Sequence, residues 1–308
     1  MTRLFAKYRR IARSISPLEI ASNYMQVDLG WDDIGLDFKE RRPSDLFLGK
    51  YSESGIRLIL KRFGLERQAR RMGIKELTID LNMDDPFRHI LRIYDGQRIK
   101  KDRILVEFIA RYQQVSPKSE ELDFLYPKPL KVLMVEWLLL QNPEKEFSPG
   151  RPRLPGQEHP GLGLGEEMLA LFGIMGRHLK VDGIMNVPRF LHTAMFFGRR
   201  SFFLSADIQV QHNQLVHDLW EKYKLAEIAW GSFTGSIIDR LSGEPFSYEP
   251  RKMLFPIRRS LVHYFRSDLY QDTAEKVDPE GRYWIDLPKL KSELRAVKNP
   301  PAMFEGTD

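Results

Sequence analysis

Four stretches in the middle of the chain carry the hydrophobic pattern of β-strands. Residues 76–81 alternate between apolar and polar positions, and residues 88–94 and 103–112 are rich in isoleucine, valine and aromatic side chains. Residues 130–140, LKVLMVEWLLL, form an almost continuous apolar run. Such a run is typical of a strand covered on both faces, although a buried helix would show it too. We predict four strands, the second and third pairing as an antiparallel hairpin.

Helical periodicity appears on both sides of this region. Residues 52–72 place apolar side chains on one face and arginines and lysines on the other, with Gly73 as a stop signal. Further predicted helices are 166–178, Pro188 to about Phe197, 211–228 and 256–270. Short strands are predicted at 181–186 and 200–204. The chain after Ala296 is expected to be loosely ordered.

Composition narrows the class of protein. With 308 residues, 42% of them hydrophobic, the chain can bury a substantial core. There is no cysteine, which excludes disulfides, thiolate metal ligands and a cysteine nucleophile, and fits a cytoplasmic protein. No run of 18 apolar residues and no secretory leader are seen, so we expect no transmembrane segment.

The chain carries a moderate net positive charge. It has 48 basic and 42 acidic residues, a net charge of +6 and an isoelectric point of about 9.3. This balance permits anionic partners without choosing among coenzyme phosphates, nucleic acid and a membrane surface. Residues 3–13 interleave arginines and lysine with apolar residues, as in a basic helix that docks on a partner. We favour the alternative, a helix packed on the body of the protein through its apolar side.

A glycine-rich turn precedes the predicted helix 166–178. It reads Pro160-Gly161-Leu162-Gly163-Leu164-Gly165 and is followed at once by Glu166. Glycine allows a backbone to approach a ligand closely, and a helix N-terminus presents free amides and a positive dipole end that suit a phosphate. The turn is therefore a candidate pyrophosphate cradle. The alternative is a turn that merely happens to be rich in glycine.

The order of these elements resembles the core of the GNAT acetyltransferases. Four strands are followed by a glycine turn, a helix, a strand, a helix and a strand. The GNAT signature is Gln or Arg, two residues, Gly, one residue, then Gly or Ala, and Gly163 and Gly165 match its glycines, with Gly161 as an often-seen extra one. The resemblance covers roughly residues 74–205.

The resemblance implies an acyl-coenzyme A site. No metal is expected, because His212 and His217 are five residues apart and have no cysteine or clustered acids around them. Backbone groups of the turn would hold the pyrophosphate: Gly161, Leu162, Gly163, Leu164, Gly165 and Glu166. Pro160 stands where Gln or Arg is usual, so one contact to the coenzyme is either missing or supplied by Gln157 or Arg153. Phe197 stands where the family commonly has the tyrosine that protonates the departing thiolate. These two departures weaken the expectation of catalysis more than the expectation of the fold.

Three residues are the candidates for acid–base chemistry. In the family a Glu on the fourth strand often acts as the base, and Glu136 is the only acid in LKVLMVEWLLL. We expect burial to raise its pKa into a useful range; the alternative is a Glu satisfied by a neighbouring Arg. Glu107 is a second candidate for the base. His192 is a substitute for the missing acid, although a lone histidine is commonly structural.

These observations predict an α+β fold, with a GNAT-like, mostly antiparallel sheet flanked by helices. We expect three segments, namely a partly helical basic extension (1–73), an acyl-coenzyme A-binding core (74–210) and a mainly helical extension (211–308). The expected function is transfer of an acyl group from acyl-coenzyme A to an amine or protein acceptor by direct attack. The alternative is a catalytically inactive GNAT-like subunit, whose basic segments 3–13 and 251–266 contact a protein complex or an anionic surface.

Overall fold

The computed structural model describes residues 3–22, 46–116, 128–297 and 301. Contacts divide the chain into two compact units, which we treat separately. Unit 1 comprises Met1–Tyr112, Leu133–Pro143 and Gly161–Lys180, and unit 2 comprises Gln113–Val132, Glu144–Pro160 and Val181–Asp308. The expected domain boundaries near residues 73 and 210 rest on motifs rather than on contacts and stay a prediction.

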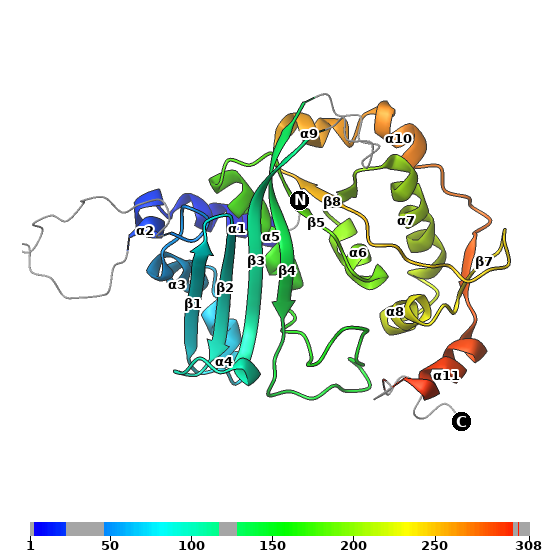
Figure 1. Cartoon of the computed structure of the whole chain (residues 1–308), viewed down its shortest axis with the longest axis horizontal. Helices are drawn as coiled ribbons and strands as arrows, with labels where there is room; N and C mark the ends of the chain where they lie inside the picture. The colour runs from blue at the N-terminus through cyan, green and yellow to red at the C-terminus, as the bar shows by residue number, and fades with distance from the viewer. Residues whose placement is uncertain (1–2, 23–45, 117–127, 298–300, 302–308) are drawn as a thin grey trace, which may run out of the picture. The chain divides into compact units, whose positions relative to one another are not determined.

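Seven strands form one sheet in the order β1-β2-β3-β4-β5-β8-β6 (Figure 1). Their bounds are β1 Leu77–Asp85, β2 Arg88–Asp95, β3 Ile104–Val115, β4 Leu130–Leu140, β5 Gly183–Asn186, β6 Phe202–Phe203 and β8 Met253–Pro256. The pairings β1–β2, β2–β3, β5–β8 and β6–β8 are antiparallel. A mixed α+β fold with a mostly antiparallel sheet flanked by helices is thereby confirmed, as are the four strands predicted between residues 76 and 140.

Helices occupy both units. In unit 1 they are α1 Arg3–Arg13, α2 Pro17–Ala21, α3 Glu53–Arg62, α4 Leu65–Arg71 and α5 Gly165–His178, with a 3-10 turn at Lys101–Arg103. In unit 2 they are α6 Leu191–Gly198, α7 Ala206–Leu219, α8 Leu225–Phe233, α9 Arg259–Tyr264, α10 Asp268–Ala274 and α11 Leu287–Ala296. A second, two-stranded sheet pairs β7 Ile237–Asp239 with β9 Tyr283–Ile285.

Three predicted helices are wrong in their bounds because local stop signals were missed. The helix expected at 52–72 is broken where Gly64 adopts a left-handed φ of 78° between α3 and α4. The segment 211–228 covers parts of α7 and α8, separated by an extended Lys224. The segment 256–270 holds α9 and the start of α10, because Ser267 is extended and caps the second helix.

One further expectation is incomplete and another is wrong. The C-terminal segment has most of its regular structure in helices, as expected, but it also supplies β7, β9 and the sheet strand β8, which were not predicted. The strand β4 is not covered on both faces along its length, because Lys131, Glu136 and Trp137 are exposed. Residues 298–300 and 302–308, most of the segment expected to be loosely ordered, lie outside the described residues.

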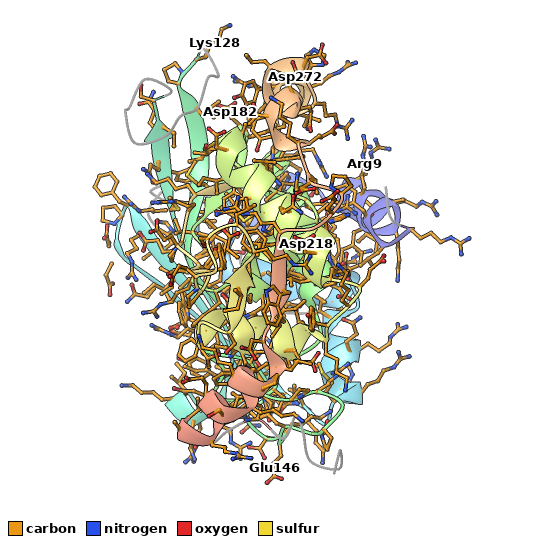
Figure 2. The ribbon with its side chains drawn as sticks, turned by 90° about the vertical axis from the view of Figure 1, so that its right-hand side faces the viewer. Arg9, Lys128, Glu146, Asp182, Asp218 and Asp272 are labelled. Carbon is orange, nitrogen blue, oxygen red and sulfur yellow. The ribbon has the colours of Figure 1, made fainter. Side chains whose placement is uncertain are left out.

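In unit 1, helices α3, α4 and α5 lie against strands β1 to β4 (Figure 1), and the side chains that line the space between them are almost all apolar. Helix α1 joins this unit through its apolar side, because Phe5 and Tyr8 are buried and the Tyr8 ring meets the edge of Phe63 at 4.8 Å. Arg9 lies on the exposed side of the same helix (Figure 2). The packed helix that we favoured for residues 3–13 is therefore confirmed.

Asp182 organises the sheet portion of unit 2, immediately before β5 (Figure 2). Its carboxylate accepts hydrogen bonds from the backbone amide of Lys131 at 2.8 Å and from the Arg258 guanidinium at 2.6 Å. Its backbone carbonyl accepts the amides of Ile257 and Arg258. One residue thus joins the start of β4, the start of β5 and the end of β8.

Candidate functional site

The glycine turn lies directly at the end of β4, although the loop 142–160 intervenes in the sequence. Gln141 and Gly161 form an isolated antiparallel bridge, and the Leu162 amide donates to the Leu140 carbonyl at 3.4 Å. The Gln141 amide in turn donates to Leu105 on β3 at 2.9 Å. The loop is thus closed at its base, so that strand, glycine turn and helix α5 follow one another in space within unit 1.

The leucines of the turn, rather than its glycines, are the residues that pack. Leu162 is 8% exposed and belongs to an apolar cluster with Ala69 and Leu105, against which Leu164 is also packed. Gly161 and Gly163 are exposed. The alternation of glycine and leucine therefore anchors the turn by its side chains and leaves the glycine backbone accessible to a ligand.

Gly163 has a φ of 71°, in the left-handed region that favours glycine. Helix α5 begins two residues later, with Leu164 as its N-cap and the first helical hydrogen bond from the Met168 amide to the Leu164 carbonyl at 2.9 Å. Leucine offers no side-chain acceptor to the amides of the first turn, unlike the usual Ser, Thr, Asp or Asn cap. The dipole of the helix therefore ends at a turn that lacks a side-chain cap.

Acidic residues also occupy this helix end. Glu166 and Glu167 stand in the first turn of α5, where carboxylates stabilise the helix dipole. The Glu167 carboxylate accepts a hydrogen bond from Gln68 on α4 at 3.1 Å. Both carboxylates repel a phosphate. An anion at this turn would therefore have to bind to the backbone amides in spite of that repulsion.

Arg153 and Gln157, the expected additional contacts to a coenzyme, belong to unit 2. The Arg153 guanidinium lies over the ring of Trp230 at 5.7 Å, and its backbone carbonyl accepts the Trp230 indole N–H at 2.7 Å. The Gln157 side chain accepts the Leu154 amide at 3.0 Å and closes a local turn. Both residues therefore have structural roles within their own unit.

Glu136 does not have the buried environment that we expected for a base. Its side chain is 28% exposed, and its two oxygens accept hydrogen bonds from the guanidinium groups of Arg88 and Arg111, each at 2.7 Å. The neighbouring candidate Glu107 is similarly paired with Arg92 at 2.7 Å, and this bond contributes most to raising the pKa of Arg92. The alternative, an acid satisfied by arginine, is what the structure shows for both.

His192 is placed on α6 of unit 2, stacked on Phe190 with ring centroids 5.4 Å apart. Burial lowers its pKa from 6.5 to about 4, so the imidazole is neutral at pH 7. A neutral imidazole with so low a pKa is a poor proton donor for a leaving group. Phe197, on the same helix, is buried and contributes no hydroxyl. Neither His192 nor Phe197 therefore supplies the proton donor that an acyltransferase of this kind would use.

Three comparisons with known proteins gave no match to this chain. No family model, curated protein or solved structure matches it. None of the helices among the described residues is long and apolar enough to cross a membrane. The site must accordingly be judged on its own geometry.

Sequence reasoning missed a partly open apolar cavity of about 200 Å³ in unit 1, between the sheet and helices α3, α4 and α5. Well-packed interiors leave few voids larger than a water molecule. Periodicity could indicate the apolar faces that surround the cavity, but not the gap that remains when they pack.

Proposed function

We propose that this chain is a GNAT-like protein that binds an acyl-coenzyme A through the backbone of the turn Gly161–Gly165. The observation that carries the proposal is the bridge between Gln141 and Gly161, which brings the glycine turn to the end of β4 and to the start of α5. Exposed glycine backbone at an uncapped helix start is suited to a pyrophosphate.

The succession of elements supports the same proposal. β1, β2, β3 and β4 are followed by the glycine turn, α5, β5, α6 and β6. This is the order on which the resemblance to the GNAT core was based, and the long insertion that separated the turn from β4 is closed at its base. These observations support the scaffold and the position of the glycine turn. The negative charges of Glu166 and Glu167 limit the affinity for coenzyme A that we expect.

Between the two functions open to such a protein, we favour the catalytically inactive one. Acyl transfer by direct attack would need Glu136 to accept a proton from the amine, directly or through a water molecule. A guanidinium group already binds each of the two oxygens of Glu136 at 2.7 Å, which favours a structural role for this carboxylate. We therefore propose a binding or assembly subunit, and keep the acyltransferase as the competing candidate.

Calorimetry with coenzyme A and acetyl-coenzyme A tests the binding step. Wild-type protein should bind both ligands, and Gly163→Asp should lose binding because it adds a charge and a side chain at a left-handed position. Gly243→Asp is the matched control, since Gly243 has a φ of 73° in a turn remote in sequence. Absence of binding by the wild type would overturn the proposal, as would equal losses in the two variants.

Release of the coenzyme thiol separates the two functions. Acetyl-coenzyme A is incubated with the protein and with lysine-containing peptides or simple amines, and the free thiol is followed by its absorbance with a disulfide reagent. We expect binding without thiol release above the buffer rate. Amine-dependent release that is lost in Glu136→Gln would instead establish the acyltransferase and identify its base.

A further inference from the structure

The cavity in unit 1 is lined almost entirely by hydrocarbon. Of the described residues that line it, only Tyr51 and His178 carry a polar group on the side chain. Isoleucine, leucine, methionine and phenylalanine make up nearly all the rest. An apolar cavity of roughly 150 Å³ is known to stay dry and to bind small apolar molecules. A cavity of about 200 Å³ therefore suits an apolar ligand better than it suits water.

The cavity follows the full inner side of α5. Its lining includes Leu164 at the N-cap, Met168, Leu171 and Met175 at helical spacing, and His178 at the last helical position. A helix of 14 residues is about 21 Å long. The cavity therefore extends along the length of α5, and this elongated shape suits an extended hydrocarbon chain better than a compact ring compound.

The polar end of the cavity is basic. The ring centroids of Tyr51 and His178 lie 6.1 Å apart. The pKa of His178 is lowered mainly by burial and, to a smaller extent, by the positive charge of Lys50. The adjacent Arg177 has its pKa lowered mainly by burial and then by the positive charges of Arg9 and Arg13. Cations from α1, α5 and Lys50 therefore gather near the end of the helix that carries His178. An anionic group attached to a hydrocarbon chain would be attracted to this end.

We propose that the cavity binds a single medium-chain fatty acid, with its hydrocarbon chain along α5 and its carboxylate beside Tyr51, His178 and Lys50. The chain removes the unfilled space, and the carboxylate meets the tyrosine hydroxyl and the local positive charge. The proposal does not rest on coenzyme binding, because a fatty acid carries no phosphate and does not need the glycine turn.

Sodium laurate is the probe for this site. The full-length protein is first freed of lipid on a hydrophobic resin. It is then titrated with laurate and, separately, with dodecyltrimethylammonium, which has the same chain length and the opposite head charge. Both are kept below their micellar concentrations. We expect saturable laurate binding with a stoichiometry of one, at least 10-fold tighter than that of the cationic amphiphile. Absence of laurate binding, or equal affinities, would overturn the proposal.

Two sets of variants locate the ligand. Leu171→Trp should fill the cavity and lower laurate affinity at least 10-fold, whereas Leu241→Trp, at a position 77% exposed in unit 2, should leave it unchanged. Tyr51→Phe and the double variant Lys50→Ala/His178→Ala should weaken laurate while leaving the neutral dodecanol unaffected. Near-ultraviolet circular dichroism confirms folding, and Ile174→Phe replaces Leu171→Trp if that variant is unfolded. Unaltered laurate affinity in a folded cavity-filling variant would show that the ligand binds elsewhere.

Discussion

Gln141 and Gly161 pair in an antiparallel bridge at the end of β4, although residues 142–160 separate them along the chain. The pairing continues into the hydrogen bond from the Leu162 amide to the Leu140 carbonyl. It converts a long proline- and glycine-rich insertion into a loop with a fixed base. The start of α5 is consequently held by the sheet and does not depend on the conformation of the insertion.

Gly163→Ala should weaken the proposed coenzyme site through the backbone. A non-glycine residue in the left-handed region costs about 1–2 kcal/mol, and relief of that strain would move the amides of the turn. Gly243→Ala, at a φ of 73°, introduces the same strain in another turn. Urea unfolding should show similar losses of stability for both variants, whereas calorimetry should show weaker coenzyme A binding only for Gly163→Ala. Equal affinities would contradict a role for the turn.

Gly55→Ala should destabilise unit 1 without touching the candidate site. A Cβ atom at Gly55 would lie 1.9 Å from the carbonyl oxygen of Ile20, so α2 and α3 would have to separate. Overpacking of this kind costs about 1–3 kcal/mol. Gly150→Ala is the control, because a Cβ there meets no atom within 4 Å. The free energies of unfolding from urea titrations compare the two, and an unchanged value for Gly55→Ala would disprove the close packing.

Asp218→Ala should be the most damaging single change in unit 2. The Asp218 side chain is fully buried at the end of α7 (Figure 2). It accepts the backbone amides of Arg282 and Tyr283 at 2.7 and 2.8 Å, and also bonds to His217 and Gln214. Each buried amide left without its acceptor costs about 1–3 kcal/mol. Exposed Asp207→Ala, on the same helix, should change the free energy of unfolding by less than about 1 kcal/mol.

The Asp218 carboxylate should also make the stability of the protein sensitive to acid. Burial alone would raise the pKa of Asp218, but the hydrogen bonds from His217, Tyr283, Arg282 and Gln214 together lower it from 3.8. Its contribution to stability is therefore complete above pH 3.8 and is lost as the pH falls below that value through the lower pKa of the folded state. Urea titrations between pH 5 and pH 3 should show a steeper loss for the wild type than for Asp218→Ala.

His192 predicts a second loss of stability at milder acidity. Its pKa falls from 6.5 in the unfolded chain to about 4 in the folded one, because burial disfavours the charged ring. The unfolded state therefore binds a proton between these values that the folded state does not, and stability declines as the pH falls through this window. The contribution amounts to about 2 kcal/mol between pH 7 and pH 5. His192→Phe should make this part of the urea-unfolding profile less steep, with the remaining slope due to His212, whose pKa burial also lowers to about 4. The exposed control His263→Phe should leave the slope unchanged.

The local elements of this protein were largely determined by the sequence alone. Alternation and apolar runs placed β1 to β4 and α5 close to their observed bounds, because side-chain periodicity reflects which face of an element is buried. The failures occurred where one residue interrupts a regular pattern, as Gly64 and Ser267 do. A glycine or serine inside an amphipathic run changes the backbone without changing the hydrophobic pattern.

The candidate site depended much more on tertiary structure. The sequence identified the glycine turn, but only the fold showed that Leu162 anchors it and that Gln141 holds Gly161 beside the strand. The sequence also suggested Glu136, whereas the guanidinium groups of Arg88 and Arg111 come from other strands and could not be foreseen. Contacts between distant segments depend on register and packing, and neither is encoded in the local periodicity of the chain. The same reason explains why the apolar cavity along α5 was visible only in the folded protein.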